Sequence, residues 1–211
     1  LYDAPVENIK HLQNVAQLWR ISEDFWDDWE ALKEQFPLCR KWQKYICKGH
    51  WPDADMLPIG PMAQRAMRGT PRMSNFTPDE QYTMLTLWAM FRSPLMIGCN
   101  LPEIDDFTLN LITNKEVLDI NQYSKGNKEL FDRNGIIAWY AQSEDELTHY
   151  IAIFNTTDKD IESYTFPLQT INYIGDGHIT DLWKNESMEI KNNSVSFSVP
   201  AHSVKLIKLT K

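Results

Sequence analysis

The chain has 211 residues, of which 43% are hydrophobic, 24% charged and 12% aromatic. This composition is typical of a globular protein with a sizeable core, and the length fits one large domain or two small ones. No apolar run approaches the ~18 residues that a membrane-spanning helix needs. The formal net charge is −8, from 29 acidic and 21 basic residues, and no stripe of Lys and Arg is present. The sequence therefore argues against a nucleic-acid partner.

The first part of the chain alternates between predicted strands and helices. Residues 15–21 form a plausible short buried strand. One apolar stripe then predicts a helix, with spacings of 4, 3 and 4 between Phe25, Trp29, Leu32 and Phe36. Residues 50–57 have poor strand propensity because they contain Pro52 and two aspartates.

The clearest predicted helix begins at Thr77. Thr77 at the N-cap, Pro78 at N1 and Glu80 at N3 form a capping box. The helix should stop before Pro94, because the residue before a proline avoids helical angles. A buried strand over 95–99 and a helix over 107–112 are expected next. Strands and helices in alternation predict an α/β fold built on a parallel sheet.

The later part of the chain has a different pattern. It predicts an antiparallel β-sandwich with no helix, because short β-branched and aromatic runs are separated by Asn, Asp and Gly. The expected strands are 136–141, 149–154, 178–183, 194–199 and 203–209, with turns at 134–135 and 175–177. Ser-Lys-Gly-Asn at 124–127 interrupts the pattern. We therefore expect two domains, 1–124 and 125–211.

Arg20 and Asp24 stand where a predicted strand ends and a helix begins. In a parallel βα architecture, side chains at the C-terminal ends of strands face the functional site. Arg20 and Asp24 could therefore reach one ligand. A structural alternative is that Asp24 complements the helix dipole, with Ser22 as the cap.

A second polar stretch, at 50–57, combines aspartates with an aromatic side chain. Asp53 and Asp55 follow Trp51. A sugar suits this mixture, because its apolar ring face stacks on an aromatic while carboxylates accept bonds from its hydroxyls. An ordinary Asx turn is equally compatible. A metal site through His50, Asp53 and Asp55 is a third option, although carboxylate spacing of this kind is unspecific.

Four motifs in order give the chain a resemblance to a known family, and a fifth segment extends it. The motifs are WRISEDFWDDW at 19–29, GHWPDADMLPIG at 49–60, LWAMFRSPLMIG at 87–98 and TNKEVLDINQ at 113–122. The closing PAHSVKL at 200–206 resembles the end of that family's C-terminal β domain. Together they resemble glycoside hydrolase family 27, which contains the α-galactosidases and α-N-acetylgalactosaminidases, over nearly the whole chain.

The resemblance implies the C-terminal part of a (β/α)8 TIM barrel followed by an antiparallel β-sandwich. It places the Arg20 stretch at the sixth barrel strand, residues 50–57 at the seventh and 95–99 at the eighth. The earlier strands, and with them the nucleophilic aspartate, have no counterpart in this sequence. The chain starts without Met or a signal-peptide pattern. We therefore expect it to begin inside a longer protein.

The resemblance also implies residue roles. Asp24 is expected to be the catalytic acid/base, and Arg20 to hold the sugar's 2-substituent or neighbouring hydroxyl. Asp55 and Met56 match pocket positions, and Asp53 supports them from behind. Trp51 is the stacking surface for the sugar that the composition of residues 50–57 predicts, independently of the resemblance. No metal and no cofactor are implied. The substrate-specificity loop would fall around residues 1–5, where Tyr2 or Asp3 could touch the sugar.

The expected function is that of a retaining glycoside hydrolase releasing terminal α-linked galactose. Retaining enzymes need two carboxyl groups, so residues 1–211 alone should be inactive. A non-catalytic carbohydrate-binding protein and a β-L-arabinopyranosidase of the same family are alternatives. The expected partners are a carbohydrate substrate and the missing part of the barrel, with no nucleic acid and no membrane span. An exposed partial barrel could also drive homo-oligomer formation. The resemblance implies a secreted or periplasmic location.

Overall fold

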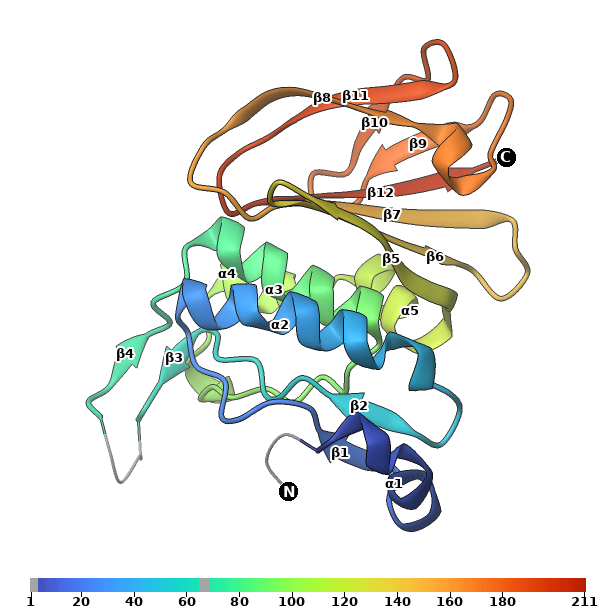
Figure 1. The fold of residues 1–211 in the computed structure, drawn as a ribbon. Coiled ribbons are helices and arrows are strands. Elements are labelled where there is room, and N and C mark those ends of the chain that lie inside the picture. Colours follow the sequence, from blue (N-terminus) through green and yellow to red (C-terminus); the bar gives the residue numbers. More distant parts are fainter. Residues whose placement is uncertain (1–3, 65–68) are drawn as a thin grey trace.

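The computed structural model describes residues 4–64 and 69–211. These residues stack in layers, with a short pair of parallel strands at one end, helices beside it, and a two-layered β-sandwich at the other end (Figure 1). Helix α1 (Ile9–Val15) lies by the parallel strands and the C-terminus lies in the sandwich (Figure 1). Residues 1–3, which include Tyr2 and Asp3 of the expected specificity loop, lie outside the described residues.

The first region carries the parallel strands and the helices. In chain order its elements are α1 (Ile9–Val15), β1 (Leu18–Arg20), α2 (Trp29–Trp42), β2 (Trp51–Asp53), β3 (Pro61–Met62), β4 (Arg72–Met73), α3 (Pro78–Phe91), α4 (Asp106–Ile112) and α5 (Lys115–Tyr123). Short 3-10 turns stand at Val6–Asn8, Gln43–Tyr45 and Leu101–Glu103. The strands β3 and β4 form a hairpin that projects from the helical layer (Figure 1).

The prediction for the first strand and helix is correct in type and wrong at the boundaries. The strand covers only Leu18–Arg20, because Val15 ends the preceding helix α1. Helix α2 begins at Trp29, four residues after Phe25, and Asp28 caps it by accepting a hydrogen bond from the Ala31 amide at 3.1 Å. Phe25 is nevertheless buried, from the loop. The apolar spacing therefore identified buried residues but not the point where the helix begins.

Helix α3 confirms its prediction. The Thr77 hydroxyl accepts a hydrogen bond from the Glu80 amide at 3.2 Å, and the Glu80 carboxylate accepts one from the Thr77 amide at 2.8 Å. The helix ends at Phe91, and Arg92 adopts a left-handed conformation with φ of 61° before Pro94. Most of α3 is buried, because it lies between α2, α5 and the sandwich (Figure 1).

The predicted buried strand at 95–99 is wrong. This segment makes only one parallel bridge, between Leu57 and Ile97. Met96 is 43% exposed and Ile97 is 37% exposed. A parallel strand is buried only when neighbours flank it and helices cover both faces, and among the described residues the segment has a partner on one side only.

The second region is an antiparallel sandwich, as predicted. Its larger sheet has the order β10-β9-β12-β7-β6-β5 and its smaller sheet pairs β11 with β8. The strands are β5 (Lys125–Arg133), β6 (Ile136–Gln142), β7 (Thr148–Asn155), β8 (Ile161–Pro167), β9 (His178–Asp181), β10 (Glu186–Met188), β11 (Ser194–Val199) and β12 (Val204–Thr210).

Three strands and one helical turn were missed in this region. The missed strands are β5, β8 and β10, and the turn is a 3-10 helix at Leu168–Ile171 that contradicts the expectation of no helix. Strand β5 contains Gly126, Asn127 and several charged residues and has irregular register with β6. Such a strand lacks strict alternation, so its sequence does not reveal it. The predicted strand at 178–183 ends at Asp181.

The six-stranded sheet is covered on both faces. Trp139, Phe154 and Leu206 belong to the core cluster that includes the helices, whereas Ile151 and Ile207 pack with the residues of β8 and β11. Side chains on a strand alternate between faces, so one sheet can supply both clusters. The helices and one face of the six-stranded sheet consequently share one apolar core, and the other face forms a second core with β8 and β11.

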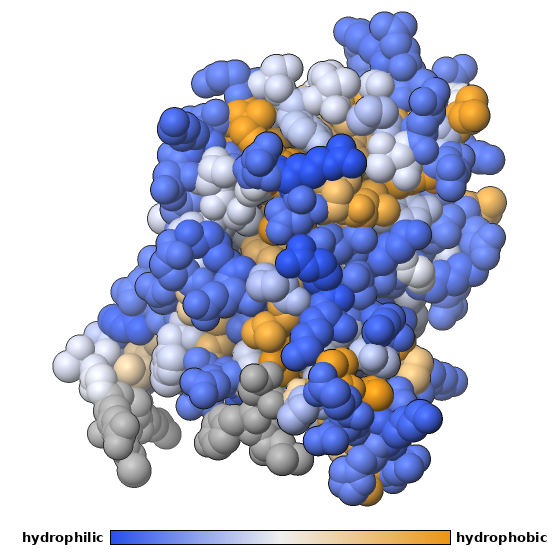
Figure 2. All heavy atoms as spheres, viewed as in Figure 1, coloured by the Kyte–Doolittle hydropathy of each residue, from blue (hydrophilic) through white to orange (hydrophobic). Residues whose placement is uncertain are grey.

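Several large apolar side chains of the first region are exposed. They are Val15, Leu18, Trp26, Met73, Met96, Ile97, Leu101, Leu109 and Tyr123. In the view of Figure 2, hydrophilic side chains cover most of the surface and hydrophobic ones show as small separate patches. Within the described ranges, no helix is both long enough and apolar enough to cross a membrane.

Candidate active site

The candidate site lies where β1 and β2 end side by side. The two strands are parallel and in register, with Arg20 opposite Asp53, and the Ile21 amide donates to the Asp53 carbonyl at 3.0 Å. The loops that follow these strands therefore leave from one edge of the sheet. This arrangement brings the two predicted polar stretches together.

Arg20 organises both loops. Its Nη2 lies 2.7 Å from Asp55 Oδ2 and also donates to the backbone carbonyls of Ser22 at 3.3 Å and Glu23 at 2.5 Å. Its Nη1 lies 3.7 Å from Asp24 Oδ1. One guanidinium therefore holds a carboxylate from the second loop and the backbone of the first. The planar fork of arginine suits this multiple role.

Asp24 is on the loop and not on the helix. Its side chain is 63% exposed, next to Arg20. Because α2 begins only at Trp29, Asp24 does not occupy its first turn and Ser22 is not its cap. The helix-dipole explanation for Asp24 is therefore wrong. The carboxyl group is free to meet a ligand from solvent.

Asp55 has an unusual backbone conformation, with φ of 83°. Its Oδ2 accepts from the Phe25 amide at 2.7 Å as well as from Arg20, and its carbonyl accepts from Trp88 Nε1 at 2.8 Å. Positive φ in a residue other than glycine is strained and persists where surrounding contacts impose it. The second oxygen, Oδ1, takes no hydrogen bond from the described residues, so it can accept one from a ligand hydroxyl.

Asp53 lies next to Asp55 and is shielded from solvent. Its residue is buried and its Oδ1 accepts from the Asp55 amide at 2.9 Å. Burial raises the pKa of the Asp53 carboxyl, and the negative charge of Asp55 adds to the rise, against the opposing effects of the Asp55 amide and Arg20. The structure thus places Asp53 as a support for Asp55.

Met56 lines a pocket of about 400 Å³ beside these loops. Trp26 and Met62 contribute further apolar walls, and Arg72 adds a guanidinium. Gly98 also lines it, and a Cβ at Gly98 would come within 2.9 Å of Met56 Sδ. A glycine at this position therefore leaves room for the Met56 side chain.

Trp51 is not brought together with the other candidates. It stands at the start of β2, opposite Leu18, and the Arg92 guanidinium lies 5.0 Å from its ring centroid. His50 Nδ1 contacts the Ala16 carbonyl at 3.3 Å. No group of three or more His, Cys, Asp or Glu side chains in residues 4–64 and 69–211 could hold a metal ion.

Sequence reasoning missed one ion pair that fixes the Asp24 loop. The buried Asp27 carboxylate pairs with the Arg72 guanidinium through two bonds, one of them 2.8 Å from Nη2 to Oδ1, and accepts from the Asn75 amide at 2.6 Å. Burial would raise the pKa of Asp27, but these hydrogen bonds outweigh it and hold the pKa below its usual value. The two residues are 45 positions apart, so local pattern gives no signal for the pair.

Comparison with known proteins identifies the family of the chain. A family model described as alpha galactosidase A matches residues 2–123, and one described as the alpha galactosidase C-terminal beta sandwich domain matches residues 134–209. The chain belongs to the α-galactosidase family, glycoside hydrolase family 27. The (β/α)8 barrel context of β1 and β2 and the sandwich that follows are those of this family.

Individual relatives place the similarity along the whole chain. The α-galactosidase of Cyamopsis tetragonoloba is 24% identical over 94% of this chain and 46% of its own length. The crystal structure of a GH27 β-L-arabinopyranosidase from Geobacillus stearothermophilus superposes with a TM-score of 0.94 at 37% identity, covering all of this chain and 48% of that one. α-Galactosidase I from Mortierella vinacea, at 20% identity and a TM-score of 0.78 over 96% of this chain and 55% of its own, shares the fold.

The chain spans about half the length of the curated relatives it matches. The matching half holds the Arg20, Asp24 and Asp55 cluster and the whole sandwich.

Proposed function

We propose that this chain is part of a retaining glycoside hydrolase that removes terminal α-linked galactose, with Asp24 as its acid/base. The supporting observation is the Arg20 guanidinium, which lies between the carboxylates of Asp24 and Asp55 at the ends of two adjacent parallel strands. Asp24 protonates the leaving glycosidic oxygen and then takes a proton from the water that hydrolyses the glycosyl-enzyme.

Substrate binding is assigned to the groups around Asp24. Asp55 Oδ1 accepts from a sugar hydroxyl, Met56 forms an apolar wall, and Arg20 binds the 2-hydroxyl or its neighbour. Asp53 holds Asp55 in place. Trp51 is not assigned to the sugar, because it lies at the opposite end of β2 from Asp53, against Arg92.

The nucleophile belongs to barrel strands outside residues 1–211. A retaining mechanism needs a second carboxyl group roughly 5–5.5 Å from the first. The exposed apolar side chains beside β1 and at 96–97 support packing against further strands. Without those strands the exposed surface would favour self-association. We also propose a division into 1–124 and 125–211, supported by the end of α5 at Tyr123 and the start of β5 at Lys125, and a secreted or periplasmic location.

A second candidate activity is hydrolysis of β-L-arabinopyranosides. The similarity to the Geobacillus stearothermophilus β-L-arabinopyranosidase, at 37% identity over this whole chain, favours it. The two sugars differ only by the hydroxymethyl group. Comparing kcat/KM for aryl α-galactoside and aryl β-L-arabinopyranoside decides between them. A protein that binds either sugar without turnover would instead be a carbohydrate-binding protein.

The role of Asp24 is tested with Asp24→Asn in the full-length protein. We expect hydrolysis of an α-galactosyl disaccharide to fall by about 10²–10⁴-fold, because proton transfer to the leaving oxygen is lost. Azide needs no deprotonation, so it should restore turnover of an aryl α-galactoside and yield galactosyl azide. Glu23→Gln removes the adjacent exposed carboxylate and is the matched control. Full activity in Asp24→Asn would exclude the proposed role.

A further inference from the structure

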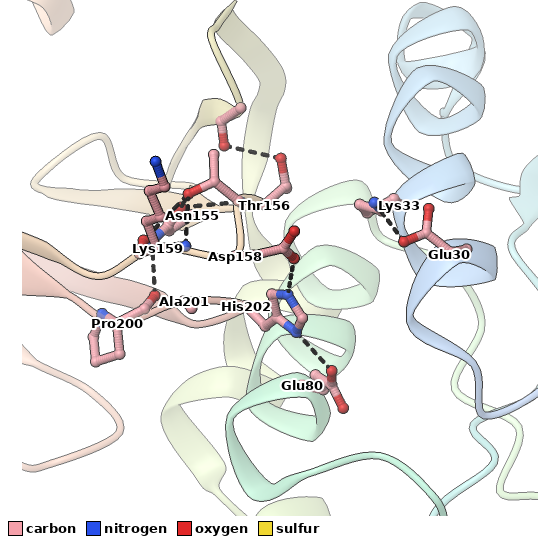
Figure 3. A network of polar contacts seen from close by, with 12 residues as sticks. Glu30, Lys33, Glu80, Asn155, Thr156, Asp158, Lys159, Pro200, Ala201 and His202 are labelled. Atoms are coloured by element: carbon pink, nitrogen blue, oxygen red, sulfur yellow. Dashed lines mark hydrogen bonds and ion pairs between the residues drawn. The ribbon is translucent and has the colours of Figure 1, made fainter.

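His202 lies in the turn between β11 and β12, on the side of the sandwich that faces the helices (Figure 3). Its φ is 57°, and its carbonyl accepts from the Thr83 hydroxyl of α3 at 2.8 Å. Next to it, the Ala201 amide donates to Asp160 Oδ1 at 2.8 Å, and the Asn155 side-chain amide donates to the Pro200 carbonyl at 2.9 Å. Contacts on both sides therefore fix the position of the imidazole.

Both ring nitrogens of His202 face carboxylates. Nδ1 lies 2.8 Å from Glu80 Oε1 in α3, and Nε2 lies 2.9 Å from Asp158 Oδ1 in the turn after β7 (Figure 3). A carboxylate can only accept hydrogen bonds, and a neutral imidazole has a single N–H. Both bonds can form together only when both ring nitrogens carry protons, so the contact requires the imidazolium ion.

The two carboxylates have further polar neighbours. Glu80 accepts from the Thr77 amide through its other oxygen and stands in the first turn of α3, where the helix dipole favours negative charge. The hydrogen bond from His202 lowers the pKa of Asp158, and Lys33 on α2 acts in the same direction. Lys33 is in turn paired with Glu30 at 2.6 Å.

The imidazole also stacks on Trp29, with ring centroids 4.0 Å apart and an angle of 15° between the planes. Trp29 is the first residue of α2, immediately after the loop that carries Asp24. That loop has two other anchors, the Phe25 amide on Asp55 and the Asp27 carboxylate on Arg72. His202 supplies a third anchor, and this one comes from the β-sandwich.

We propose that His202, as an imidazolium, is a positioning residue through which the sandwich holds the Asp24 loop in a pH-dependent way. The catalytic consequence rests on the proposed function, whereas the anchoring does not. A cation stacked on an indole is bound more firmly than a neutral ring. Loss of one ring proton therefore weakens the stack and breaks one of the two hydrogen bonds.

Several charged groups surround the His202 ring. Glu80 and Asp158 bond it directly, Lys33 and Glu30 lie on α2 nearby, and Asp160 holds the same turn. The two hydrogen bonds need a proton on each ring nitrogen, so raising the pH should weaken the anchor.

Hydrogen exchange in the full chain tests this inference. After correction for the intrinsic effect of pH, amides of the 22–28 loop in His202→Gln should exchange about 10-fold faster than wild type at pH 5.5 and less than about twofold faster at pH 8. His11→Gln, which changes an exposed histidine of α1, is the control, and its loop amides should exchange at the wild-type rate at both pH values. Amides of Leu85–Trp88, buried in α3, report global opening and should keep wild-type exchange.

Asp158→Asn provides a second variant that should fold, because the Asp158 side chain is 88% exposed. It leaves the Glu80 bond and the Trp29 stack, so the difference in loop exchange between pH 5.5 and pH 8 should shrink by at least half. An equal effect of His202→Gln at both pH values, or an unchanged pH difference in Asp158→Asn, would overturn the proposal. Exchange needs no turnover, so this outcome is independent of whether the chain's sugar chemistry is as proposed.

Discussion

The six-stranded sheet and the β1–β2 pair are stabilised in opposite ways. In the larger sheet, β6, β7 and β12 pair over seven residues each, and apolar layers cover both faces. The pair β1–β2 is in register over three residues, and Leu18 and Val15 beside it are exposed. Buried area and ladder hydrogen bonds hold the six-stranded sheet, whereas long-range polar contacts fix the loops that follow β1 and β2.

This difference shows how a site with strained backbone is maintained. Asp55, with φ of 83°, depends on Arg20, the Phe25 amide and Trp88 for its conformation. A parallel strand pair gives little stability by itself, because such sheets need cover on both faces. The sandwich contributes through the core it shares with α3 and through the turn that carries His202.

The largest expected effect is in the shared core. Phe154 is fully buried in β7, with its ring 5.0 Å from Phe36 of α2. Phe154→Ala should lower the free energy of unfolding by about 3–5 kcal/mol, since it leaves a cavity between the sheet and the helices. Urea unfolding measures this loss. Ile174→Ala, at a side chain that is 79% exposed, is the control and should change the free energy by less than about 0.5 kcal/mol. A small effect of Phe154→Ala would mean that the two layers are not coupled.

The next largest loss of stability is expected from breaking the ion pair between Asp27 and Arg72. Arg72→Met removes the partner of the buried Asp27 carboxylate and should cost about 2 kcal/mol at pH 7, less than for a fully buried pair because Arg72 is partly exposed. The pKa of Asp27 is lowered in the folded protein, so its contribution is present above the unfolded value near 4 and is lost as pH falls through the folded value. The difference in free energy of unfolding between Arg72→Met and wild type, measured by urea unfolding, should therefore be smaller at pH 3.5 than at pH 7. A gap that stays constant with pH would contradict the role of the ion pair.

The smallest loss of stability is expected at the N-cap of α3. Thr77→Ala removes the N-cap hydroxyl of α3 and should lower the free energy of unfolding by about 1 kcal/mol. Thr77→Ser keeps the hydroxyl and should stay close to wild type. Thermal unfolding of the three proteins makes the comparison, and equal losses in both variants would show that the cap hydroxyl is not the cause.

Local chemistry predicted much of the fold and part of the site. The capping box at Thr77 and the proline at position 94 act within one helical turn, so the sequence located α3 closely. Arg20 and Asp24 are four residues apart and their pairing followed from strand-end position and family resemblance. Strand β5 and the buried pair of Asp27 with Arg72 had no such local signal. Whether Asp24 acts as the acid/base stays a prediction.

The sequence by itself determined the helix at Thr77, the antiparallel sandwich and the family, because apolar periodicity, turn residues and motifs are local properties of the chain. Only the tertiary structure decided which side chains meet. It joined Arg20 to Asp55 across 35 positions and His202 to Glu80 across 122, and it moved Trp51 away from the other candidates. Contacts between distant segments depend on how layers pack, and packing is fixed by the whole core and not by any one stretch of sequence.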